Sequence, residues 1–215
     1  AEIQSILERL DAGNLKTVRL AAFALLSYDT MARPSEILGT RYGKGDWQTL
    51  PLTFADLKWC ADGSGRVKIR NGRTLDKVDS LQISPMTVTA LQRWLSASGV
   101  TDGPIFREVS AKNRATSKPL RPDNGGREIL SIVPAVAKSA TVRLDSFRLG
   151  GMRDRLAKGQ SVVDVLATNR WSRSLHSMDR ILRHCPQTLP GAPAQKLAHQ
   201  CALRVVPFRS QSTDR

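Results

Sequence analysis

Apolar residues follow helical spacing in the first part of the chain. Between Ile3 and Leu10 they recur every three or four positions, which predicts an amphipathic helix that ends at Gly13. Residues 15–31 are apolar almost all round, a pattern typical of a buried helix at the centre of a core. Pro34 ends that helix, and either Pro34 or Ser35 starts a short one. The chain therefore begins with helices.

The pattern changes to strands between Leu52 and Ser84. Val67 and Ile69 alternate with basic residues, which predicts a half-buried strand with one basic face. A first strand lies in residues 54–60 and a third in Leu81–Ser84, separated from the middle strand by Gly- and Asn-rich turns. We expect a small antiparallel sheet of three strands.

Helical periods return after the sheet. The predicted elements are a helix capped by Thr87 and ended near Gly99, a basic loop over 107–126, and helices over 129–136, 147–158 and 162–167. Pro134 is expected to kink or restart the first of these three, and Ser161 to cap the last. Prolines crowd after Leu182. The sequence thus predicts one mainly helical α+β domain over residues 1–182 and an irregular, Pro-rich tail over 183–215.

The net charge of the chain indicates the kind of molecule that it binds. Lys and Arg number 33 against 19 Asp and Glu, a formal net charge of +14. Such a surplus favours nucleic acid first and an anionic membrane second, against the simpler interpretation of a soluble basic protein. No run reaches the roughly 18 apolar residues of a membrane span, and we find no signal peptide. The three cysteines lack CxxC spacing and fit a reducing, cytoplasmic location.

One stretch suggests a family. From Asp145 the chain reads Asp-Ser-Phe-Arg, with Arg148 opening a helical run that leads to Trp171. Much earlier, Arg33 follows the buried helix and precedes a Ser-Glu helix start. These residues and their spacing resemble the active site of tyrosine recombinases, the phage-integrase family. The resemblance covers roughly residues 1–180, without the family's N-terminal DNA-clamp domain, and it implies the recombinase catalytic-domain fold.

The resemblance assigns a phosphate clamp. Arg33 and Arg148 stand where the family has the two arginines that hold the scissile phosphate, and a pair of Arg forks suits a phosphodiester. Trp171 stands where the family has a Trp that donates an indole N–H to phosphate. Each has a plain structural alternative: Arg33 as a charge at a helix end, Arg148 in a salt bridge with Asp145 or Asp154, and Trp171 in the core.

Several catalytic positions are substituted. Arg73 stands in the strand turn where the family has a Lys acid, and an arginine does not readily release its proton. Lys77 could replace that acid, although a solvated turn residue explains it as well. Asp145 stands where the family has His, and its carboxylate only accepts hydrogen bonds at neutral pH. Asp145 is also a favoured helix N-cap residue.

The nucleophile is missing. Arg180, or Ile181 if one residue is inserted, stands where the family has its Tyr. The two tyrosines of the chain, Tyr28 and Tyr42, both precede Trp171. Tyr28 falls in the buried helix and is expected in the core. His and Cys residues in the tail match no metal-binding spacing, so we expect neither a metal nor a cofactor.

We expect a recombinase-like domain that binds duplex DNA without cutting it. The expected DNA contacts are Arg33, Arg73, Lys77, Lys112, Arg114, Lys118 and Arg148. Other protomers on the DNA are a further expected partner, and the expected location is the nucleoid. The alternative is an active integrase whose nucleophile is unidentified or supplied in trans. A decayed gene product without a selected role is the third hypothesis.

Overall fold

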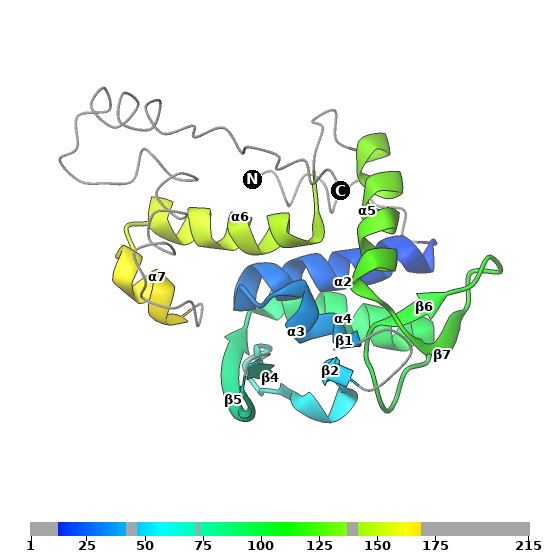
Figure 1. Cartoon of the computed structure of the whole chain (residues 1–215), viewed down its shortest axis with the longest axis horizontal. Coiled ribbons are helices and arrows are strands. Elements are labelled where there is room, and N and C mark those ends of the chain that lie inside the picture. Colours follow the sequence, from blue (N-terminus) through cyan, green and yellow to red (C-terminus); the bar gives the residue numbers. More distant parts are fainter. Residues whose placement is uncertain (1–12, 42–46, 72–73, 137–141, 169–215) are drawn as a thin grey trace, which may run out of the picture. The chain divides into compact units, whose positions relative to one another are not determined.

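The computed structural model describes residues 13–41, 47–71, 74–136 and 142–168 (Figure 1). Its helices are α2 (Leu15–Thr30), α3 (Pro34–Leu38), the 3₁₀ helix η1 (Phe54–Asp56), α4 (Pro85–Ser98), α5 (Pro122–Val136), α6 (Leu144–Ala157) and α7 (Val162–Thr168). Its strands are β1 (Thr40–Arg41), β2 (Trp47–Thr49), β3 (Leu57–Trp59), β4 (Gly65–Asn71), β5 (Thr74–Ile83), β6 (Arg107–Val109) and β7 (Ala115–Pro119). The helix expected between Ile3 and Leu10 lies outside the described residues.

The described residues divide into two compact units between Asp154 and Arg155, so the boundary falls within α6. The sheet and the helices α2 to α5 belong to the first unit. The second unit holds the end of α6 and α7, where the Ser161 hydroxyl accepts from the Asp164 N–H at 3.1 Å. This bond confirms Ser161 as the cap of α7. None of the helices in the described ranges is long and apolar enough to span a membrane.

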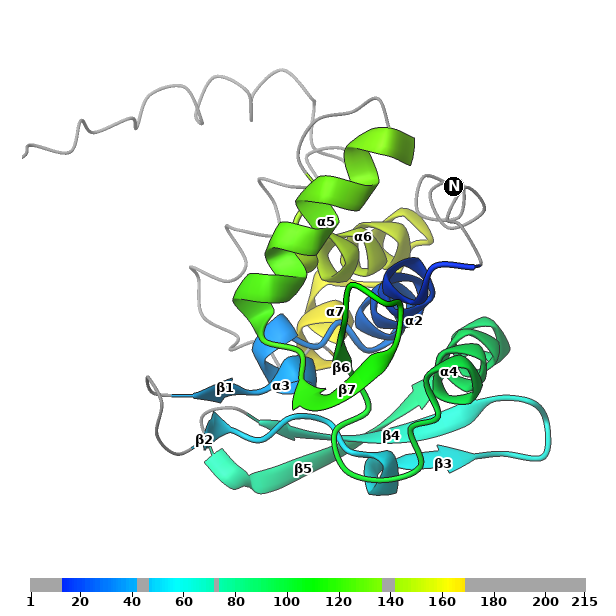
Figure 2. The ribbon, with the colours of Figure 1, turned by 90° about the vertical axis from the view of Figure 1, so that its right-hand side faces the viewer.

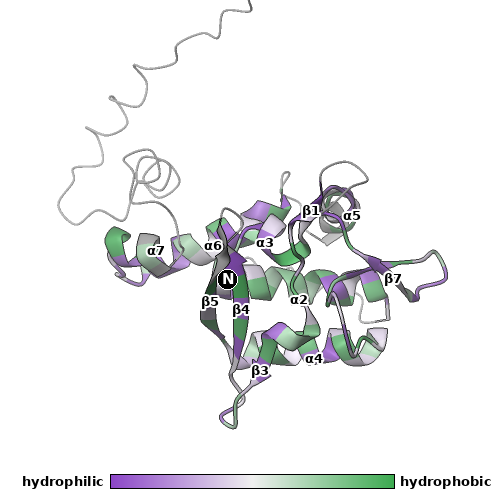
Figure 3. Cartoon of the chain, turned by 60° about the horizontal axis from the view of Figure 1, so that its bottom comes forward, coloured by the Kyte–Doolittle hydropathy of each residue, from purple (hydrophilic) through white to green (hydrophobic). Residues whose placement is uncertain are grey.

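Helix α2 is the centre of the first unit. Asn14 caps its start by accepting from the Lys16 N–H at 2.9 Å, and the helix ends at Met31, which adopts the left-handed conformation with φ 49°. Ala22, Leu26 and other apolar side chains of α2 are fully buried, in agreement with the predicted core helix. Figure 3 shows its largely hydrophobic colouring, and α2 packs on α4 and β5.

The main sheet has the order β3-β4-β5, and both pairs are antiparallel. Val67 and Ile69 are fully buried under the helices while Arg66 and Lys68 are exposed, so the predicted alternation is confirmed. Figure 2 shows α2 and α4 on the same side of this sheet. The third strand is longer than the four residues expected, because β5 begins at Thr74 and pairs with β4 along its length.

Residues 107–126 were expected to be a loop, and this prediction is wrong. They form the β6–β7 hairpin and the first turns of α5. The hairpin turn contains Asn113 with φ 55°, a conformation that Asn tolerates. Its side chain accepts from the Leu15 N–H at 2.8 Å and donates to the Gly13 carbonyl at 2.9 Å. The start of α2 therefore holds the hairpin turn in place.

Helix α5 starts earlier than its apolar period indicates. Pro122 occupies its first position, where a missing N–H does no harm, and the Gly125 N–H bonds the Arg121 carbonyl at 2.9 Å. Gly125 and Gly126 lie inside the helix, although glycine pairs usually indicate a loop. Pro134 does not restart the helix, which continues through it to Val136.

Helix α4 is capped by Ser84 and not by Thr87. The Ser84 hydroxyl accepts from the Thr87 N–H at 3.4 Å. The Asp29 carboxylate of α2 accepts from the Ser84 N–H at 2.7 Å and from the Thr87 hydroxyl at 2.6 Å. A negative charge at this helix start is favourable because the macrodipole is positive there. Asp29 thus joins α2 to α4.

A buried cation also ties the unit together. Arg19 of α2 is 1% exposed, and it donates to the Arg107 carbonyl and to the Glu128 carboxylate of α5. Its guanidinium lies 5.9 Å from the centre of the Trp94 ring. Burial lowers the pKa of Arg19, while the charge and hydrogen bond of Glu128 raise it. Arg19 therefore links α2 to β6, α5 and α4.

Helix α6 lies close to the backbone of α2 at Gly151. A Cβ there would overlap the carbonyl oxygen of Tyr28, whereas Gly126 of α5 has nothing within 4 Å of the same position. We predict that Gly151→Ala lowers the free energy of unfolding by about 1–3 kcal/mol through overpacking. The control Gly126→Ala should raise it by up to about 1 kcal/mol, because alanine favours a helix. Urea denaturation measures both, and equal effects would refute the close contact.

Candidate functional site

Arg148 lies on α6 and is 4% exposed. Its Nε donates to the Met31 carbonyl at 2.8 Å, and its Nη1 donates to the Asp145 carboxylate at 3.3 Å. Burial lowers the pKa of Arg148 to about 10, and the Asp145 carboxylate opposes this shift. The side chain stays charged at neutral pH, because this pKa lies well above 7. The salt bridge to Asp145 is one of the two that the sequence suggested.

The turn between α2 and α3 presents Arg33. Met31 leaves the helix in the left-handed conformation, and Arg33 is extended at φ −70°, ψ 148° as the N-cap residue of α3. The Arg33 N–H donates to the buried Glu36 carboxylate at 2.7 Å. The Ala32 N–H donates to the Thr30 hydroxyl at 3.2 Å. Both ends of this short turn are therefore fixed.

The Arg33 side chain is half-buried. Within the part of the chain that the structure describes, its guanidinium has neither a hydrogen bond nor an ion pair. Burial has the largest effect on the Arg148 pKa, the Asp145 carboxylate follows, and the positive charge of Arg33 comes next. The charge of Arg33 lowers this pKa. The two arginines are thus near enough for their charges to repel. An anion between them would relieve that repulsion.

Asp145 does not cap α6. The helix begins at Leu144, which places Asp145 inside its first turn, where a carboxylate favours the positive end of the macrodipole. The residue that bonds across this helix start is Ser146, whose hydroxyl accepts from the Arg143 N–H at 2.9 Å. The Asp145 side chain, 35% exposed, is directed to Arg148 instead. It therefore competes with any anion for that guanidinium.

Tyr28 contributes to the α2–α6 contact. Its hydroxyl donates to the Asp154 carboxylate at 2.5 Å, and the residue is half-buried, not fully buried as its place in α2 suggested. Asp154, the other acid that the sequence offered to Arg148, is therefore bound to this phenol. This hydrogen bond orients the Tyr28 side chain toward α6, near the close contact between the Tyr28 backbone and Gly151.

The remaining predicted residues fall into three groups. Lys112, Arg114 and Lys118 are exposed on the β6–β7 hairpin. The backbone of Lys77 lies in β5. Outside the described residues lie Arg73, Trp171, Arg180, Ile181 and Tyr42. In the described ranges no three His, Cys, Asp or Glu side chains gather in a group that could hold a metal ion.

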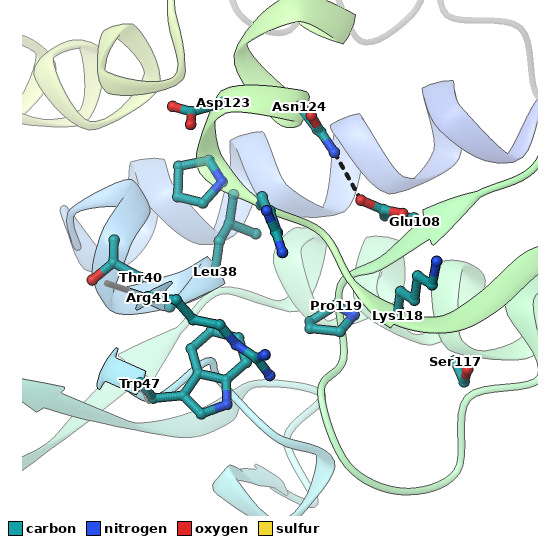
Figure 4. A pocket seen from close by; sticks show the side chains of 13 residues that line it. Leu38, Thr40, Arg41, Trp47, Glu108, Ser117, Lys118, Pro119, Asp123 and Asn124 are labelled. Atoms are coloured by element: carbon teal, nitrogen blue, oxygen red, sulfur yellow. Dashed lines mark hydrogen bonds between the residues drawn. The ribbon is translucent and has the colours of Figure 1, made fainter. Parts of the chain in front are cut away.

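A cavity of about 810 Å³ lies elsewhere in the first unit (Figure 4). Its walls come from the end of α3 with β1 and β2, from the β6–β7 hairpin, and from the start of α5. They comprise residues 38–41, Trp47, Glu108, 117–119 and 121–124. Sequence analysis missed this cavity because its walls come from three separate segments that show no common motif.

The fold is that of the catalytic domain of tyrosine recombinases. XerH recombinase in a pre-cleavage complex with its difH substrate superposes with a TM-score of 0.58 and 14% identity, over 94% of this chain and 52% of XerH. A post-cleavage XerH complex with palindromic difH gives a TM-score of 0.60 and 14% identity, over 94% of this chain and 51% of XerH. XerA recombinase gives a TM-score of 0.60 and 14% identity, over 94% of this chain and 62% of XerA. The chain therefore spans about half to three-fifths of these proteins.

These structural likenesses confirm the predicted mainly helical α+β fold with its small antiparallel sheet. No protein-family model matches the sequence, and no curated protein is significantly similar to it. At 14% identity, the likeness establishes the fold and leaves the activity to be argued from the site.

Arg148 should matter for stability as well as for charge. Arg148→Met leaves the buried Met31 carbonyl without this donor and Asp145 without this cation, and we expect a loss of about 2 kcal/mol in the free energy of unfolding. The variant no longer buries a charged group, which favours folding, but the Met31 carbonyl and the Asp145 carboxylate still lose their partner. Arg153→Met, exposed on the same helix, is the matched control and should change stability by less than about 0.5 kcal/mol. Urea unfolding that shows no difference would contradict the anchoring role.

Proposed function

We propose that the chain binds duplex DNA through a cationic surface that includes Arg33 and Arg148, and that it does not cut the DNA. The observation that carries the proposal is that Arg33, a half-buried residue, lies two positions after the carbonyl that Arg148 binds, with no carboxylate paired to its side chain in the described ranges. Two arginine forks that repel each other are stabilised by a shared phosphate, which accepts hydrogen bonds from both.

Further charge supports a polyanionic partner. The formal net charge is +14, and Lys112, Arg114 and Lys118 are exposed on one hairpin. Phosphate contacts supply most of the affinity of sequence-independent DNA binding. XerH, whose fold resembles this chain, was solved in complex with its difH substrate. A DNA-associated, nucleoid location and neighbouring protomers on the same DNA belong to this proposal, as do contacts from Arg73 and Lys77.

The missing phenol supports binding without cleavage. Phosphoryl transfer needs a nucleophile placed in line with the leaving group. Tyr28 bonds Asp154, and no Tyr follows Trp171 in the sequence. At the positions that resemble the family's acid and His, Arg73 keeps its proton and Asp145 carries a negative charge. Cationic binding survives these substitutions, whereas proton transfer does not.

The first test of this proposal is the salt dependence of binding. Affinity for duplex DNA should fall with rising salt at a log–log slope of about −0.9 per phosphate contact. Arg33→Gln should weaken binding and flatten the slope by about one unit, since it removes one contact. Arg93→Gln, exposed on α4, is a control for net charge and should leave the slope almost unchanged. Fluorescence anisotropy across a salt series measures the slopes, and identical slopes for all three proteins would exclude Arg33 from the interface.

The second test is the absence of a covalent intermediate. A nicked suicide duplex incubated with the protein should give no protein–DNA band on a denaturing gel. Placing Tyr at position 180 alone should not restore the band, because residues that act as a unit are not additive and the acid and His would still be missing. A covalent band from the unaltered chain would favour the active-recombinase alternative, and mapping the attached residue would identify the nucleophile.

A further inference from the structure

The cavity between β1–β2, the β6–β7 hairpin and α5 has a volume of about 810 Å³. Small-molecule sites commonly measure about 300–1,000 Å³ and combine apolar walls with a few polar groups. Here Leu38, Pro119 and Pro122 supply apolar surface, and Trp47 supplies an aromatic ring. Neither Arg33 nor Arg148 lines the cavity, so it is separate from the candidate phosphate clamp.

Trp47 is held in a fixed place. It packs against Gly39, where an added Cβ would lie 2.7 Å from the Trp47 ring and 2.7 Å from the Pro51 nitrogen. Gly39 also has φ 74°, which disfavours other residues. The Arg41 guanidinium lies 4.0 Å from the centre of the Trp47 ring (Figure 4). This distance is typical of a cation–π stack, and the stack forms one wall of the cavity.

The charges around the cavity favour an anion. Arg41, Lys118 and Arg121 are exposed along its walls, and in the described part of the chain no ion pair joins them to a carboxylate. Of the two acids in the walls, Glu108 accepts from the Asn124 amide at 2.7 Å. Asp123 lies in the first turn of α5. The three cations outnumber the two acids, so a net positive charge remains beside an aromatic stack.

We propose that this cavity binds a single nucleotide. The base adds to the Arg41–Trp47 stack, since guanidinium planes and indole rings both stack on bases. Arg121 and Lys118 hold the phosphate, which also lies near the positive end of the α5 dipole. The ligand is a nucleoside monophosphate, either free or as one unit of a single strand. This inference goes beyond the proposed duplex binding and rests on different residues, apart from Lys118.

The first measurement is equilibrium dialysis of the full chain against dAMP. We expect dAMP to bind at least about tenfold more tightly than deoxyadenosine, which lacks the phosphate, or deoxyribose 5-phosphate, which lacks the base. A single-stranded trinucleotide of deoxyadenosine distinguishes a site for a free nucleotide from a site for one unit of a strand. If it binds more tightly than dAMP, the cavity takes a unit of a strand, and otherwise it takes the free nucleotide. Equal binding of dAMP and its two fragments would overturn the proposal.

Two variants test the contacts. Trp47→Ala should weaken dAMP binding by about tenfold or more, the usual effect of losing one base stack. Arg121→Gln should weaken dAMP binding and leave deoxyadenosine binding unchanged, because only the phosphate contact is lost. Arg121 is exposed, so this second variant keeps the test decisive if Trp47→Ala does not fold. Arg93→Gln on α4 is the control and should bind dAMP normally. Unchanged dAMP binding by Arg121→Gln would also overturn the proposal.

The proposals of duplex binding and of nucleotide binding can be tested independently of each other. Arg33→Gln should weaken duplex binding without changing dAMP binding, and Trp47→Ala should change dAMP binding more than duplex binding. A hexaglutamate peptide that displaces dAMP at similar concentration would show a general anion site and refute a nucleotide site. Loss of duplex binding with dAMP binding intact would refute only the proposed function.

Discussion

The hydrogen bond from the Arg148 guanidinium to the Met31 carbonyl controls the geometry of the candidate site. Helix α2 ends at Met31 in a left-handed turn, and a carbonyl at a helix end has no partner within the helix. Arg148 reaches this carbonyl from a residue 117 positions away and is almost fully buried as it does so. The end of α2 and the body of α6 are therefore joined at one polar contact. Arg33 lies two residues after Met31, in a turn that is also held by its own N–H bond to Glu36.

The elements that the sequence predicted well are those whose hydrophobic pattern is local. Residues 15–31 are apolar almost all round, and α2 covers Leu15–Thr30 of them. The alternation around Val67 places β4 with the correct face inward. Ser161 caps α7 because its hydroxyl bonds an N–H only three residues later. In each case the deciding interaction lies within a few residues of the pattern that predicts it.

The errors arise where distant contacts decide the local structure. The β6–β7 hairpin has a polar sequence, yet Asn113 fixes its turn through bonds to residues about 100 positions away at the start of α2. Helix α5 begins at Pro122 and contains two glycines whose helical state is not indicated by local propensity. Arg19 interrupts an apolar helix, and its partners Arg107 and Glu128 are 88 and 109 residues distant. The resemblance to recombinases located Arg33 and Arg148, but it gave no account of these supports.

Arg148 and Arg33 carry different weight as indicators of function. Arg148 has a structural task that is independent of any ligand, since it bonds the Met31 carbonyl and the Asp145 carboxylate. Arg33 has no such task among the described residues, because its backbone N–H bonds Glu36 while its side chain has no bonded partner there. The Asp145 and Glu36 carboxylates raise the Arg148 pKa against the effect of the Arg33 charge, and an anion bound by Arg33 would offset the repulsion further. The stronger argument for phosphate binding is therefore Arg33 at the helix start, whose side chain has no bonded partner among the described residues, and not the buried Arg148.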